Sequence, residues 1–156
     1  MPELLAAIRP DDQSFALLLH LVGATVAFGA LLASATSLLL ARGEPRLLRL
    51  GYYSLLLVAL PGWILMRLAG EWLYRLQHWN DLPDQFDQPA WLKIGHIVAD
   101  WGGLLFLLAL ALGGLGIHRL RKNESNTALL RATTLIALIL IAAYIVAVWA
   151  MTGKPN

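Results

Sequence analysis

The sequence predicts an all-α protein, an integral membrane bundle of four helices. Of its 156 residues, 58% are hydrophobic and 14% are charged, whereas a soluble domain carries about 25% charged residues. Backbone amides inside a bilayer must find hydrogen-bond partners within their own segment, so we expect each long apolar stretch to be a helix. Residues 1–156 then form a single transmembrane domain. The stretches, each longer than the ~20 residues that cross a hydrocarbon core, are 15–41, 50–73, 91–117 and 128–151.

The loops between these stretches differ in charge, and the difference predicts an orientation. The first and third loops, residues 42–49 and 118–127, are basic, whereas the second, residues 74–90, carries three aspartates. The positive-inside rule places the basic loops in the cytoplasm of a cell whose inner (plasma) membrane holds the protein. Both termini and the acidic loop then face the outer, periplasmic side. Because the basic residues lie at membrane edges, the expected partner is the lipid bilayer and not a nucleic acid.

A short internal similarity favours two tandem two-helix halves. His20-Leu-Val-Gly in the first stretch resembles His96-Ile-Val-Ala in the third. Two parallel halves related by an axis normal to the membrane would produce such a repeat. Chance similarity between leucine-rich helices explains it equally well, so both interpretations stay open.

The ionisable residues of the apolar stretches gather in the outer half of the membrane. His20 and His96 each lie five residues into a helix that enters from the outer side, so their rings share a depth of about 8 Å below the interface. Arg67 lies at a similar depth, and Asp100 is one turn deeper than His96. Ionisable groups inside a membrane are costly, and they mark either function or a paired structural site.

The spacing of these residues suggests how they pair. His96 and Asp100 are four apart and share a helix face, so Asp100 could orient the imidazole. Arg67 and Glu71 are also four apart and could neutralise each other. We expect His20 and His96 to approach each other inside the bundle, with Arg67 close by, because neither histidine can face lipid without a polar partner.

One hypothesis is that His20 and His96 are the axial ligands of a b-type haem, in a protein with an electron-transfer or oxidoreductase role. A guanidinium, Arg67 or Arg75, would pair with the propionates. A first-row metal or a proton path would use the same residues, and whether the chain is an enzyme stays open. The small residues that follow His20, together with Gly102 and Gly103, would leave room for the haem macrocycle. Four tryptophans could pack around it: Trp63, Trp72, Trp91 and Trp101.

The rival hypothesis is a haem-free accessory or scaffold subunit of a larger, respiratory-type membrane complex, or a homo-oligomer. In that case the small residues form a seam for close helix packing, and Trp72, Trp79 and Trp91 form an interfacial belt. The histidines and their charged neighbours then form a buried hydrogen-bonded network. The chain has no cysteine, which excludes thiolate metal sites and covalent haem attachment under either hypothesis. The seam consists of His20, Gly23, Ala27, Ala30, Ser34 and Ser37.

Two stretches resemble small four-helix bacterial integral membrane proteins. They are Leu18-Leu19-His20-Leu21-Val22-Gly23 with the small residues up to Gly29, and Trp91-Leu92-Lys93 at the start of the third helix. The resemblance is to HemJ-type protoporphyrinogen oxidases, to the membrane domain of copper resistance protein D, and to uncharacterised relatives. Similarity to the HemJ group implies a b-type haem held by His20. The HemJ pattern has a lysine where this chain has Gly95, and the uncharacterised relatives imply no function.

Overall fold

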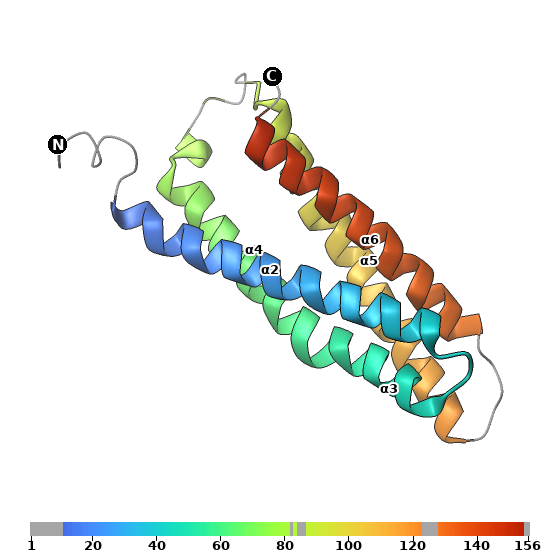
Figure 1. The fold of residues 1–156 in the computed structure, drawn as a ribbon. Helices are drawn as coiled ribbons and strands as arrows, with labels where there is room; N and C mark the ends of the chain where they lie inside the picture. Colours follow the sequence, from blue (N-terminus) through green and yellow to red (C-terminus); the bar gives the residue numbers. More distant parts are fainter. Residues whose placement is uncertain (1–10, 82, 84–86, 123–127, 155–156) are drawn as a thin grey trace.

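The computed structural model describes residues 11–81, 83, 87–122 and 128–154, and within them it is helical without any strand. Four of its helical spans are long and apolar enough to cross a membrane, which confirms the predicted helices. Figure 1 shows them side by side in one elongated bundle. The elements are α2 (Asp11–Leu40), α3 (Pro45–Ser54), the π-helical turn η1 (Leu55–Ala59), α4 (Leu60–Leu76), the 3-10 turn η2 (Trp79–Asp81), α5 (Ala90–Arg121) and α6 (Ala128–Gly153).

Most helices extend beyond the apolar stretches that predict them. The second span runs without a break from Pro45 to Leu76, and α5 continues to Arg121. Pro45 occupies the first turn of α3, where its missing N–H has no intrahelical acceptor in any case. Pro89 precedes α5 in an extended conformation, and its carbonyl accepts the N–H groups of Leu92 and Lys93. Polar residues at the ends of the apolar stretches therefore continue the helices.

The second span is irregular at its centre. The N–H of Leu60 donates to the carbonyl of Leu55, five residues earlier, so the chain forms a π turn immediately before Pro61. Proline has no N–H, and its ring clashes with the carbonyl four residues before it, here that of Leu57. Widening the preceding turn accommodates the ring, as π turns inside α-helices do. The pair Pro61-Gly62 suggests a kink in this span, and the structure has a π turn immediately before the pair.

The most extensive helix contacts join α2 to α4 and α5 to α6. The helices of each predicted two-helix half are therefore packed directly on each other, while the symmetry between the halves stays a prediction. A central core of buried side chains, among them Leu31, Leu55, Phe106 and Leu140, joins all four spans. A smaller cluster of buried residues consists of Leu38, Ala41, Leu48, Ile117 and Leu130.

The two ends of the bundle differ. At the basic-loop end, where α2 turns into α3 and α5 ends, the smaller cluster holds the helices together and Arg121 donates to the Tyr53 hydroxyl at 2.7 Å. At the acidic-loop end, where α4 ends and α5 begins, Figure 1 shows the α2–α4 pair spread away from the α5–α6 pair. Long side chains bridge α4 and α5 there, and these side chains include the candidate site residues.

Candidate functional site

His20 packs directly on the backbone of α4. Its Nδ1 lies 2.9 Å from the carbonyl oxygen of Met66, and the ring is half-buried. A carbonyl can only accept a hydrogen bond, so Nδ1 carries the proton and the Nε2 of the neutral ring keeps its lone pair. Gly70 allows this close approach, because a Cβ at Gly70 would lie only 3.0 Å from Nδ1.

His96 lies on α5 and contacts α4 through an aromatic ring. The ring centroids of His96 and Tyr74 are 5.1 Å apart, in an edge-to-face arrangement with an interplanar angle of 74°. The Tyr74 hydroxyl accepts a hydrogen bond from Nε2 of Gln88 at 3.1 Å, which ties the acidic loop to α4. The imidazole of His96 has no hydrogen-bond partner among the residues that the structure describes.

The two histidines contact one face of α4. His20 touches α4 at Gly70 and His96 touches it at Tyr74. These two positions are four residues apart, and residues at that spacing are neighbours on the same helix face. His20 therefore touches the backbone of α4 directly, His96 is joined to α4 through the ring of Tyr74, and both contacts lie at the acidic-loop end.

Arg67 and Asp100 form an ion pair between α4 and α5. Nη2 of Arg67 lies 2.8 Å from Oδ1 of Asp100. The pairing differs from the two suggested by spacing, since Glu71 instead accepts from Nε of Arg75 at 3.2 Å. Arg67 therefore finds its partner on α5, while Glu71 pairs one turn further along its own helix. Arg67 and Asp100 side chains are 37% and 59% exposed, so the pair lies at the rim of the interface.

The small-residue seam of α2 is a packing surface. A Cβ on Gly23 would lie 2.5 Å from the backbone nitrogen of Met66 and 2.8 Å from the carbonyl oxygen of Gly62. The space for a haem that Gly102 and Gly103 of α5 were expected to leave is also filled beside Gly103. The indole of Trp63 lies 2.7 Å from where a Cβ of Gly103 would be. Backbone and indole atoms thus occupy these positions, and a macrocycle would have to lie closer to the acidic-loop end.

The tryptophans separate into an inner one and a set near the helix ends. Trp63 packs on Phe106 with ring centroids 6.0 Å apart. Trp79 and Trp91 contact each other edge to face at 5.9 Å, where the acidic loop meets α5. The indole of Trp101, at 67% exposure, faces away from the core. Of the four tryptophans suggested as a haem environment, Trp63 alone packs against the central core. Whether Trp72, Trp79 and Trp91 form an interfacial belt stays a prediction.

Sequence reasoning overlooked Tyr74 and Gln88, the residues that join His96 to α4 and to the acidic loop. A signal was present, because Tyr74 follows Arg67 by seven residues, which is two helical turns on one face. His118, at the opposite end, is exposed. Among the described residues no three histidine, aspartate or glutamate side chains converge as a metal site would require. A bis-histidine haem needs two axial ligands, so that finding does not test it.

No family model, curated protein or solved structure matches this chain. The resemblance to the HemJ and copper resistance groups therefore stays a prediction. The polar residues at the acidic-loop end are the features of the structure that bear on function.

Proposed function

We propose that the chain is a multi-pass protein of the inner (plasma) membrane with its basic-loop end in the cytoplasm. The four long apolar helices support insertion. The two basic loops, residues 42–49 and 118–127, contain six arginines and lysines, and such residues bias a loop towards the cytoplasm. The histidines and the Arg67–Asp100 pair then lie in the outer leaflet. The six basic residues are Arg42, Arg46, Arg49, Arg119, Arg121 and Lys122.

Within that frame we propose that His20 and His96 hold a b-type haem, and that the protein transfers electrons. The hydrogen bond from His20 to the Met66 carbonyl carries this proposal. Protein histidines that ligate metals through one nitrogen commonly donate the other N–H to a carbonyl or a carboxylate, which fixes the tautomer and orients the ring. His20 has that arrangement, and its Nε2 is the nitrogen left for iron.

The other residues fit the same group. His96 has no competing hydrogen bond among the described residues, so its ring is available as the second ligand. Asp100 engages one terminal nitrogen of Arg67, and a guanidinium with five N–H donors keeps others for a propionate. Trp63 fills the space beside Gly103 and closes the interior below the histidines. Two imidazole ligands would leave the iron without an open position, so the haem would supply one-electron transfer.

The absorption spectrum of the purified protein tests this proposal. The chain would be produced in cells supplied with a haem precursor, and the purified protein would also be titrated with hemin in detergent. A Soret band that shifts on addition of dithionite, with resolved α and β bands, is the expected result for two histidine ligands. A protein that stays colourless and does not bind hemin contradicts the proposal.

The second candidate, a haem-free accessory subunit, is favoured by the exposure of the Arg67–Asp100 pair. Both side chains belong to helices that are long and apolar enough to cross a membrane, yet they are 37% and 59% exposed. A charge pair exposed at this depth is costly unless another polar surface covers it. A partner helix, or a second copy of this chain, would provide that cover.

Photo-crosslinking in native membranes separates this candidate from the first. A photoreactive amino acid at Trp101, beside Asp100 and 67% exposed, should give one discrete adduct if a partner covers the pair. The control position is Leu115, also exposed on α5 but nearer the basic-loop end. An adduct of twice the 17.1 kDa chain mass indicates a homo-oligomer. Lipid adducts alone at both positions, in a protein that binds haem, contradict the accessory role.

A further inference from the structure

A groove opens at the basic-loop end, opposite the histidines. It lies between the end of α2, the turn into α3 and the first turns of α6, and it encloses about 580 Å³. That volume falls within the roughly 300–1,000 Å³ of small-molecule sites in proteins. The residues that line it are Leu38, Leu39, Arg42, Gly43, Leu48, Leu130, Arg131, Thr134, Leu135 and Leu138.

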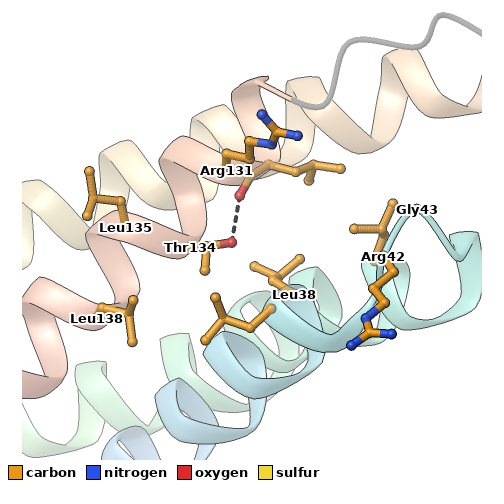
Figure 2. A pocket seen from close by; sticks show the side chains of 10 residues that line it. Leu38, Arg42, Gly43, Arg131, Thr134, Leu135 and Leu138 are labelled. Carbon is orange, nitrogen blue, oxygen red and sulfur yellow. Dashed lines mark hydrogen bonds between the residues drawn. The ribbon is translucent and has the colours of Figure 1, made fainter.

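The groove is apolar along its length and basic at its rim. Its floor is formed by Leu38, Leu48 and Leu130, which are buried members of the smaller core cluster. The leucines of its walls are exposed on the outer surface of the helices. Thr134 contributes no free donor, because its hydroxyl donates to the Leu130 carbonyl at 2.8 Å, the dashed line in Figure 2.

Two arginines, Arg42 and Arg131, flank the groove. Neither the Arg42 nor the Arg131 side chain has a hydrogen bond or an ion pair among the residues that the structure describes. Arg42 stands at the turn after α2, where its φ is 42° and the φ of Gly43 is 93°. Figure 2 shows the two guanidinium groups on opposite sides of the groove, directed away from each other. An exposed arginine changes rotamer within nanoseconds, so either group can turn towards a ligand at the mouth.

We propose that this groove binds an anionic phospholipid, with an acyl chain against the leucines and the phosphate at Arg42 and Arg131. The apolar walls match a hydrocarbon chain, and guanidinium groups match phosphate in geometry and charge. Basic pockets between transmembrane helices on the cytoplasmic side bind anionic lipid headgroups. The proposed orientation decides only which leaflet supplies the lipid, and the proposal is independent of haem.

Native mass spectrometry with added lipid tests the groove. The detergent-solubilised full chain would be titrated with phosphatidylglycerol and, separately, with phosphatidylcholine of the same acyl chains. We expect the wild type to bind the first lipid more tightly. Arg42→Gln or Arg131→Gln should each weaken phosphatidylglycerol binding about fivefold, since one basic residue near an anionic surface contributes about that factor. Neither substitution should change phosphatidylcholine binding.

Two further variants separate the groove from general charge attraction. Arg49→Gln removes the same charge from the same end of the protein, at an exposed position that does not line the groove, and it should leave the preference unchanged. Leu138→Trp keeps both arginines and fills the apolar part, so it should weaken binding of both lipids. The proposal is overturned if Arg49→Gln acts as strongly as Arg42→Gln, if the two lipids bind equally, or if millimolar glycerol phosphate displaces the phospholipid completely. The last result would identify a site for free phosphate esters.

Discussion

Arg67 and Asp100 join α4 to α5 through a 2.8 Å ion pair at the end of the bundle where the helix pairs spread apart. Arg67 is on α4 beside the positions that contact the histidines, and Asp100 is one turn from His96 on α5. The pair therefore fixes the spacing of the two helices that position the candidate site. Each charge also neutralises the other.

Loss of one partner should destabilise the protein. Asp100→Asn leaves the guanidinium of Arg67 without its counter-charge, and because both side chains are partly exposed we expect the free energy of unfolding in detergent to fall by about 1 kcal/mol. The double variant Arg67→Gln/Asp100→Asn should lose less than the sum of the single variants, with a coupling of about 1 kcal/mol. The free energy of unfolding of the wild type, the two single variants and the double variant would be measured in mixed micelles with an increasing fraction of denaturing detergent. Glu71→Gln removes the partner of Arg75 from a pair four residues apart on one helix, and its effect should stay within about 0.5 kcal/mol. If the effects of Arg67→Gln and Asp100→Asn on the free energy of unfolding simply add, the interaction between the two side chains contributes nothing to stability.

Gly23 should tolerate no side chain. A Cβ there would meet backbone atoms of α4 at 2.5 and 2.8 Å, and backbone cannot move aside as a flexible side chain can. We expect Gly23→Ala to separate α2 from α4 at a cost of about 1–3 kcal/mol in unfolding free energy. Gly29→Ala is the matched control on the same helix, because nothing lies within 4 Å of a Cβ at that position. It should stabilise the protein by no more than about 1 kcal/mol. Equal effects of the two substitutions would contradict close packing at Gly23.

The number and type of helices could be predicted because hydropathy alone determines them. A stretch such as residues 128–151 has so few polar groups that a membrane helix is the economical outcome, and its helix is observed at Ala128–Gly153. The end points were less predictable. Polar residues such as Arg121 continue a helix at no cost once it leaves the hydrocarbon, and hydropathy does not register them.

The pairing within the candidate site could not be predicted, since it depends on how the helices rotate against each other. Spacing along the sequence points to Glu71 as the partner of Arg67, whereas Asp100 lies on another helix, and only the arrangement of the helices in space brings it to Arg67. The same holds for His20, whose contact is a backbone carbonyl that has no sequence signal. The groove at Arg42 and Arg131 could not be predicted either, because the residues that line it are far apart in the sequence.

The orientation predicts which positions a membrane-impermeant thiol reagent can reach. The chain has no cysteine, so single cysteines can be added without removing any. In intact cells with a permeabilised outer membrane, Gln77→Cys at the acidic-loop end should be labelled. Asn123→Cys, in the loop after α5 and outside the described residues, should be labelled only after the inner membrane is disrupted. Both substitutions are neutral and leave the charge distribution intact. Labelling of Asn123→Cys in intact cells would reverse the orientation and move the histidines to the inner leaflet.

The histidines themselves give the last prediction. If His20 and His96 are axial ligands, His20→Ala and His96→Ala should each abolish the low-spin spectrum and lower haem affinity by more than the roughly 10–100-fold that loss of an outer-shell partner costs. His118→Ala is the matched control, since His118 is exposed at the opposite end of α5. Removal of the imidazole leaves a gap beside Gly70 in the first variant, so free imidazole added to His20→Ala should restore part of the low-spin signal in absorption and electron paramagnetic resonance spectra. A variant that merely unfolds would not respond to imidazole. Wild-type spectra in both alanine variants would exclude these two residues as ligands, even in a protein that binds haem.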